Sequence, residues 1–196
     1  MSNLESTQRQ GSERADATEA GATEKTTGVA REPHADRART SAVKAKPGPE
    51  HKRLDAFAGT WRMRGRAYDS PFGKAADVSA VQMYEWLPGG MFLIHRLEGR
   101  LGDAPMACIE IIGVESGSGR YFAHTFYNDG NANLWRVREQ DGGWEFSGDW
   151  KIESDTYRAR CRITFDDGGD RRTAKWEYSR DGSSWKPFWD TEHTRI

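Results

Sequence analysis

Three of the five histidines lie in segments where apolar and polar residues alternate, and each falls in phase with apolar neighbours. They are His95, His124 and His193. Because residues in phase on a β-strand point to the same face, we expect all three side chains to face the interior of a sheet protein. The opposite face of the His95 segment, with Phe92 and Ile94, is almost as apolar, so the orientation of His95 stays open.

Imidazole side chains titrate near neutral pH, bind metals and transfer protons. Interior histidines could therefore contact a ligand, hold a metal ion through nitrogens about 2 Å away, or move a proton. A histidine that only packs in the core, with its ring nitrogens bonded to carbonyl groups or water, is the simpler alternative. The alternation in the sequence is compatible with each of these roles.

Aromatic residues are the second chemical feature, with 8 Trp, 8 Phe and 6 Tyr, all between Leu54 and Ile196. Aromatic side chains fill cores, and they also line cavities that take apolar ligands. We expect most of them in the core and a few on a cavity wall. The predicted ligand-binding residues are His95, His124, Trp135, Trp189 and His193.

The sequence contains no Gly-x-Ser-x-Gly, no glycine-rich phosphate loop before a helix and no His-Glu-x-x-His motif. We therefore predict no catalytic residue and no metal ligand. A binding protein is favoured over an enzyme, and the question of enzymatic activity stays open.

Alternating segments separated by turn residues dominate the chain after residue 58. The first of them, Gly59 to Tyr68, places Trp61 and Met63 on one face and arginines on the other. Asp-Gly pairs such as Asp129-Gly130 are hairpin signals. The pattern predicts an all-β fold of about ten strands in antiparallel up-and-down order, either a barrel or a sandwich. We expect a single antiparallel up-and-down β-barrel, because closing the sheet removes exposed edges. It also predicts a loop over Gly99 to Pro105 and a short helix over His51 to Ala58.

Residues 1–50 contain no Phe, Tyr or Trp. Such a segment buries too little apolar surface to offset its conformational entropy. We predict a disordered tail over 1–50, ended by a Pro-Gly-Pro break that extends neither helix nor strand, and one barrel domain over 51–196.

The formal net charge of −1 lacks the basic excess of a general nucleic-acid binder. No apolar run approaches the roughly 20 residues of a membrane span, and the N-terminus lacks a secretory signal, so a cytoplasmic location is expected. Cys108 and Cys161 form no Cys-x-x-Cys pair and are expected as buried thiols.

Several short motifs along residues 51–196 resemble one family in their order. They are the helix and Gly-x-Trp opening at His51–Trp61, Leu87-Pro-Gly-Gly-Met-Phe92, Ile111-Ile-Gly-Val114, Phe126-Tyr-Asn-Asp-Gly130, Trp144-x-Phe-x-Gly148, Asp181-Gly-x-x-Trp185 and Thr194-Arg195. Together they resemble an uncharacterised bacterial lipocalin-like family of calycin type, a domain of unknown function. The resemblance implies a ten-stranded barrel with a central cavity, and it implies that Trp61 and Arg195 meet where the last strand returns to the first.

The resemblance makes a small-molecule binding barrel, with an apolar or amphipathic ligand, the leading interpretation. No cofactor is predicted. The alternative is a haem- or metal-dependent enzyme using the inward histidines, because some haem-binding barrels of lipocalin-like shape ligate iron through a histidine on the final strand, where His193 lies. A protein–protein adaptor that recruits through the tail is a further alternative. We expect no nucleic-acid or membrane partner, and a homo-oligomer is compatible with the sequence.

Overall fold

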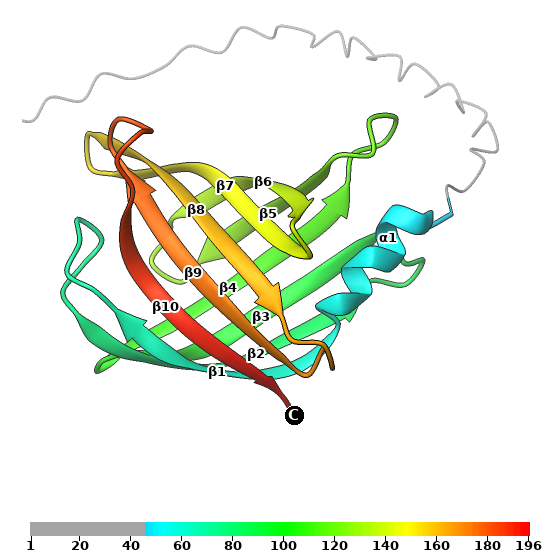
Figure 1. Ribbon diagram of the computed structural model, residues 1–196, viewed down its shortest axis with the longest axis horizontal. Coiled ribbons are helices and arrows are strands. Elements are labelled where there is room, and N and C mark those ends of the chain that lie inside the picture. The colour runs from blue at the N-terminus through cyan, green and yellow to red at the C-terminus, as the bar shows by residue number, and fades with distance from the viewer. Residues whose placement is uncertain (1–45) are drawn as a thin grey trace, which may run out of the picture. The chain divides into compact units, whose positions relative to one another are not determined.

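A computed structural model describes residues 46–196, which form a closed barrel of ten antiparallel strands (Figure 1). The first 45 residues of the predicted disordered tail lie outside the described residues. Each strand pairs with its neighbours in chain order, and β1 pairs with β10. The elements are α1 (Pro49–Arg53), η1 (Leu54–Ala56), β1 (Gly59–Ala67), β2 (Ala76–Trp86), β3 (Phe92–Leu101), β4 (Ala104–Val114), β5 (Tyr121–Tyr127), β6 (Ala132–Gln140), β7 (Gly143–Ile152), β8 (Asp155–Phe165), β9 (Arg171–Ser179) and β10 (Lys186–Arg195).

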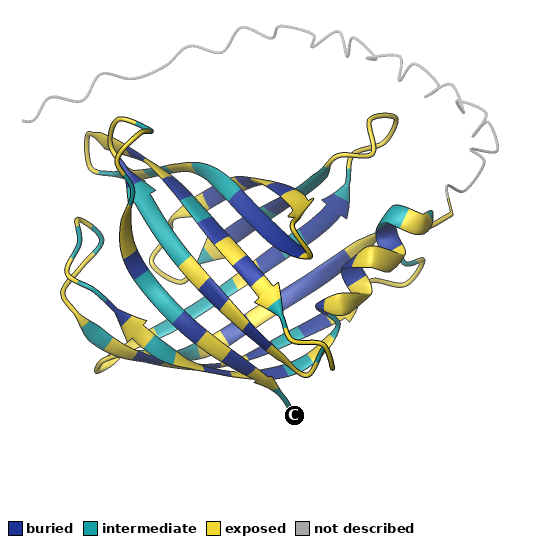
Figure 2. Cartoon of the chain, viewed as in Figure 1, coloured by how far each residue is buried: buried dark blue, intermediate teal, exposed yellow. Residues whose placement is uncertain are grey.

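Alternation between buried and exposed residues runs along most strands, as Figure 2 shows. It follows from the two-residue period of a strand with one face on the core. The predicted all-β, up-and-down barrel is confirmed. The loop predicted over Gly99 to Pro105 is wrong, because β3 continues to Leu101 and β4 begins at Ala104. Gly102, at φ 57°, supplies the positive φ that lets so short a turn join them.

The barrel closes where β1 meets β10, and Trp61 and Arg195 are direct partners in that register. The Arg195 guanidinium lies 4.2 Å from the centroid of the Trp61 ring. It donates to the carbonyl oxygens of Ala58 and Gly169 and forms an ion pair with Asp170 at 3.2 Å. One side chain thus joins the last strand to the first and to the β8–β9 turn.

The N-terminal helical turns cover this end of the barrel. Leu54 and Phe57 are fully buried in the same core cluster as Trp61. The helix begins at Pro49, inside the segment predicted as a break, because proline is tolerated at the first helical position, where its missing N–H has no intrahelical acceptor. Within residues 46–196, no helix is long and apolar enough to span a membrane.

Candidate functional site

A row of polar side chains crosses the inner wall from β2 to β5. Tyr84 pairs with His95, His95 with Glu110, and Glu110 with Thr125, each in direct cross-strand register. Because each residue is in phase with the buried face of its strand, the register brings all four together inside the barrel. This polar row is part of the fold, and no loop is needed to position it.

Hydrogen bonds link the residues of the polar row from Thr125 to His95, and the donor and the acceptor of each bond can be assigned. Trp135 Nε1 donates to Thr125 Oγ1 at 3.0 Å, so the Thr125 hydroxyl donates to Glu110 Oε2, at 2.5 Å. The other Glu110 oxygen lies 3.1 Å from His95 Nδ1. An ionised carboxylate only accepts, so His95 Nδ1 carries the donated hydrogen. The His95 ring also stacks on Tyr84, with centroids 4.1 Å apart.

A second polar group comes from β9 and β10, where Arg172 and His193 are cross-strand partners. Gln82 Oε1 lies 2.7 Å from Arg172 Nη2 and 2.9 Å from His193 Nδ1. Since that oxygen only accepts, His193 carries its hydrogen on Nδ1. Thr191 Oγ1 lies 3.0 Å from His193 Nε2 and 3.3 Å from the carbonyl oxygen of Ala174, so its one hydrogen serves only one of these two acceptors. When His193 is neutral, that hydrogen points to Nε2.

Burial lowers the pKa of His193 to about 2, and the nearby charge of Arg172 adds to this effect. Burial also raises the pKa of the Tyr84 hydroxyl, against the opposing charge of Arg172. It raises the pKa of Cys108 to about 12 and that of Cys161 well above its usual value. These four groups are therefore uncharged at neutral pH.

Arg172 is the buried cation of this interior, with 2% of its surface exposed. Nη2 donates to Gln82 and to the Tyr84 hydroxyl, but Nε and Nη1 have no hydrogen-bond partner among residues 46–196. Aromatic rings surround the guanidinium, with Trp61 at 4.4 Å and Phe57 at 5.4 Å from its central carbon to the ring centroid. Ring faces attract a cation but accept no conventional hydrogen bond from these donors. The guanidinium thus retains unused hydrogen-bonding capacity.

These groups face an interior cavity of about 110 Å³ to which all ten strands contribute residues. His95 Nε2, on the ring edge opposite Glu110, also has no hydrogen-bond partner among residues 46–196. The wall also contains apolar and aromatic residues: Met63, Leu97, Phe146, Ile163 and Trp176. The cavity is therefore lined by both polar and apolar side chains, and two of the polar ones, Arg172 and His95, carry unpartnered nitrogen atoms.

Four of the five predicted ligand-binding residues line this cavity: His95, His193, Trp135 and Trp189. Trp189 lies toward the open end and is partly exposed. The prediction that His124 faces the interior is wrong. On β5 the buried positions are Ala123 and Thr125, so His124 lies on the outer face, where its ring contacts Phe126 at 4.4 Å between centroids. Phe126, whose bulk suggested an inward face, is itself exposed.

The histidines as placed do not fit a haem or a three-histidine metal site. Both ring nitrogens of His193 are engaged, and the cavity beside it is far smaller than a macrocycle. His124 lies on the opposite side of the wall from His95 and His193. Among residues 46–196, no three His, Cys, Asp or Glu side chains lie together in a way that could hold a metal ion.

Sequence reasoning missed the polar residues of the cavity other than histidine, although two of them left a signal. Arg172 is in phase with Ala174 and Trp176, and Glu110 stands alone in a strongly apolar strand. A charged residue in phase with the core is unusual unless it is paired or functional. Gln82, Tyr84 and Thr125 gave no comparable signal, because such residues occur on either face of a strand.

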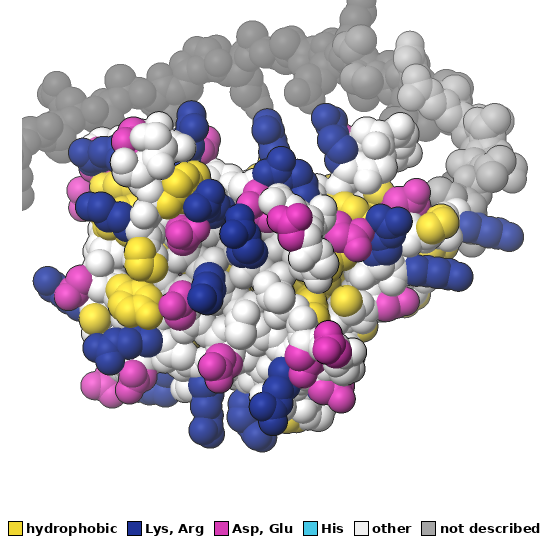
Figure 3. Space-filling model, viewed as in Figure 1, with side chains coloured by type: hydrophobic (Ala, Val, Ile, Leu, Met, Phe, Trp, Pro, Cys, Tyr) yellow, Lys and Arg dark blue, Asp and Glu magenta, His cyan; other side chains and the backbone are white. Residues whose placement is uncertain are grey.

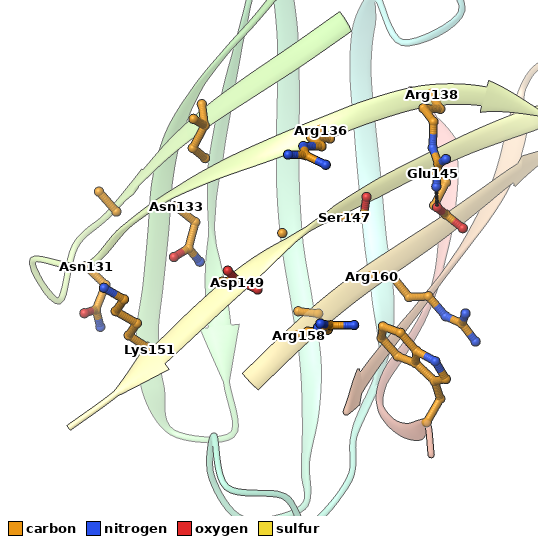
Figure 4. Close-up of a pocket in the computed structure, with 15 residues that line it drawn as sticks. Asn131, Asn133, Arg136, Arg138, Glu145, Ser147, Asp149, Lys151, Arg158 and Arg160 are labelled. Atoms are coloured by element: carbon orange, nitrogen blue, oxygen red, sulfur yellow. Dashed lines mark hydrogen bonds and ion pairs between the residues drawn. The ribbon is translucent and has the colours of Figure 1, made fainter. Parts of the chain in front are cut away.

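A larger hollow of about 890 Å³ lies on the outer wall over β6, β7 and β8 (Figure 4). It follows the shortest ladder of the barrel, since β6 and β7 pair only from Arg136↔Ser147 to Gln140↔Gly143. Its charged side chains include the pair Arg138–Glu145, and Arg160 lies over the Trp185 ring. The face drawn in Figure 3 intersperses Lys and Arg with Asp and Glu. This hollow is an open, mixed-charge surface, so the interior cavity is the better candidate site.

Comparison with known proteins places the chain in a family and supports its fold. A family model described as "Protein of unknown function (DUF1579)" matches residues 46–195. The crystal structure of Rv2717c from M. tuberculosis is 13% identical, with a TM-score of 0.55 over 76% of this chain and 98% of that one. A de novo designed fluorescence-activating β-barrel is 16% identical, with a TM-score of 0.40 over 73% of this chain and 96% of that one. No curated protein matches the chain. The expected uncharacterised barrel family is confirmed, whereas its lipocalin-like relationship stays a prediction.

Proposed function

We propose that this chain, which belongs to the DUF1579 family of proteins of unknown function, is a binding protein for a small amphipathic molecule held inside its barrel. One observation carries the proposal. The interior cavity of about 110 Å³ is lined by Arg172 and His95 together with apolar and aromatic residues, and both residues carry nitrogen atoms that have no hydrogen-bond partner among residues 46–196. Buried polar groups in proteins nearly always have a partner, so these two residues are available to a ligand or a water molecule that enters the cavity.

The size of the cavity restricts the ligand. Drug-sized molecules occupy pockets of about 300–1,000 Å³, so a retinoid or a long fatty acid does not fit as the side chains stand. A cavity measured in this way needs about 10–15 Å³ for each water-sized group, so it takes a molecule of about seven to eleven non-hydrogen atoms. The ligand is therefore still expected to be amphipathic, as the sequence suggests, but it must be small.

A second cavity at the barrel mouth, of about 230 Å³, adjoins the first. The two share Tyr127, Trp150, Phe188 and Trp189 as wall residues. Phe72, on the β1–β2 loop, inserts between these aromatics and lies 4.7 Å from Phe188 and 5.1 Å from Trp150 between ring centroids. A ligand tail that displaced Phe72 would extend from the interior into this space.

The test is a titration of the full chain with straight-chain alcohols, amines and carboxylates of two to eight carbons. Trp135 and Trp176 line the cavity, so their fluorescence reports its occupation. We expect saturable quenching for at least one head group and weaker binding beyond the length that the interior and the mouth can hold.

The buried Ala174 lines the cavity, whereas its neighbour Thr173 is exposed. The variant Ala174→Val should therefore weaken binding, and Thr173→Val should leave it unchanged. The proposal fails when no probe gives saturable binding, or when the two valine variants bind alike.

A further inference from the structure

We propose that the polar group of the ligand is an anion, with a carboxylate as its simplest form, and that it enters the cavity together with one proton, which His95 takes up. This inference rests on the proposed function, because it names the ligand chemistry and the proton linkage of the same cavity. It is carried by the unpartnered nitrogens of Arg172 and His95, two residues that both contact Tyr84.

The first step concerns the charge of Arg172. Its Nε and Nη1 together hold three N–H groups that have no acceptor. Among the described residues that line the cavity, Glu110 is the one carboxylate, and both of its oxygens are engaged, one by His95 and one by Thr125. The guanidinium therefore lacks a dedicated counter-ion. An anion in the cavity would supply both the missing charge and the missing acceptors.

The second step concerns His95. Its Nδ1 donates to Glu110, so a neutral ring keeps a bare lone pair on Nε2, which has no partner among residues 46–196, and the residue lines the cavity. A lone pair repels an anionic oxygen, whereas an N–H donates a charge-assisted hydrogen bond to it. Anion binding therefore favours the imidazolium, whose other nitrogen is already held by the Glu110 carboxylate. The proton comes from solvent and stays on Nε2 while the anion is bound.

The other groups around His95 cannot take that proton in its place. A proton placed on Glu110 would neutralise the acceptor of His95 Nδ1 and give the anion no new N–H donor, and Arg172 is already cationic. His193 is held neutral by burial and by the charge of Arg172, which lower its pKa to about 2. The tyrosines and thiols of the cavity are acids whose pKa burial raises, so they keep their protons and gain none: Tyr84, Tyr127, Cys108 and Cys161.

The experiment is isothermal titration calorimetry of the full chain with four probes of equal chain length: butanoate, butanesulfonate, 1-butanol and butylamine. Each is measured from pH 6 to pH 8, in two buffers of different ionisation enthalpy. We expect both anions to bind with uptake of close to one proton, and their affinity to fall by up to about tenfold per pH unit as pH rises. The sulfonate stays ionised throughout, so its pH dependence belongs to the protein. Butanol should show no proton uptake.

Matched substitutions test which residue takes up the proton and which residue supplies the positive charge. His95→Gln should abolish proton uptake, whereas His124→Gln, on the outer face of β5, should leave it intact. Arg172→Gln should weaken the anions by about tenfold or more, the range of a lost charged hydrogen bond, and change butanol little. Arg171→Gln, the exposed neighbour on β9, should bind like the unmodified chain.

The possible results distinguish a failure of the anion and proton inference from a failure of the proposed binding function. Binding of butanol or butylamine without either anion overturns the inference and leaves the binding function standing. Anion binding without proton uptake also overturns it, and this readout needs no variant, so a misfolded His95→Gln protein does not prevent the test. Absence of binding by all four probes overturns the inference and the proposed function together.

Discussion

Arg172→Met should make the ligand-free protein more stable while removing its response to anions. In the ligand-free barrel the buried guanidinium keeps two hydrogen bonds, to Gln82 and Tyr84, and the attraction of nearby rings. Those contacts roughly offset the cost of desolvating the charge, which is several kcal/mol per ion in proteins. Methionine is similar in length and loses no such hydration.

The magnitude follows from what methionine adds. A buried Met side chain contributes about 2 kcal/mol through the hydrophobic effect, and the two unpartnered nitrogens of Arg172 disappear. The buried Tyr84 hydroxyl loses the donor that Arg172 supplies, at a cost of about 1 kcal/mol. We therefore expect Arg172→Met to raise the free energy of unfolding by about 1 kcal/mol, or the Tm by about 2–4 °C. Charged groups that lower the stability of the ligand-free protein are common in binding sites.

Urea denaturation followed by tryptophan fluorescence measures this difference, with Arg171→Met as the exposed control, expected within about 0.5 kcal/mol of the unmodified chain. Saturating butanoate at about 100 times its Kd should stabilise the unmodified chain by about 2.7 kcal/mol and Arg172→Met by almost nothing. A loss of more than about 2 kcal/mol in Arg172→Met would refute the reasoning, because Arg172 would then be a structural part of the core.

Three further predictions concern the barrel itself. Folding holds the pKa of His193 near 2, so the unfolded chain, with an imidazole pKa of about 6.5, binds a proton that the folded chain does not. Stability should fall by up to about 1.4 kcal/mol per unit as pH drops below 6.5, and His193→Gln should flatten this dependence between pH 6.5 and 4.5 in urea denaturation. Gly65→Ala should destabilise the barrel by about 1–3 kcal/mol, measured in the same way, because its Cβ would overlap the backbone oxygen of Asp190 on β10. Cys108 and Cys161 should resist thiol reagents at pH 8 in the folded chain and react on unfolding, since burial raises both pKa values.

Each of these three predictions has a control variant or a result that would contradict it. His124→Gln should keep the pH dependence that His193→Gln loses, and equal slopes in the two variants would contradict the burial argument. Gly168→Ala, where a Cβ meets no atom closer than 4.0 Å, should cost little, so equal losses at the two glycines would remove the packing explanation. Rapid labelling of either thiol before unfolding would show that the wall is open.

Residue alternation was enough to predict the strands and their antiparallel order. The β-strand period of two is a local property, and Asp-Gly turns join neighbours in sequence, so little long-range information is needed. The same alternation failed at β5, where the outer face carries the two phenylalanines, Phe122 and Phe126, and the inner face carries two tyrosines, Tyr121 and Tyr127. Side-chain size predicted the wrong inner face there, because the small Ala123 and Thr125 are the residues that face the crowded interior.

The site was predictable only in part for a related reason. His193 and Trp189 could be placed on the inner face from their own strand, and His95 only with its orientation open, but the register between strands decides which inner residues meet. Glu110 lies opposite His95 through the β3–β4 register, and Arg172 lies opposite His193 through β9–β10. Those pairings place the two histidines in two hydrogen-bonded groups that meet at Tyr84, one of them with a buried cation, and no local pattern contains them.

The most direct test of the interior site is a crystal structure of the full chain with butanoate. We predict that the carboxylate of butanoate lies inside the barrel, with its oxygens about 2.7–3.2 Å from Arg172 Nη1 or Nε and from His95 Nε2. Butanoate bound only at the outer hollow beside Arg136 and Arg158, with water alone in the interior, would contradict it.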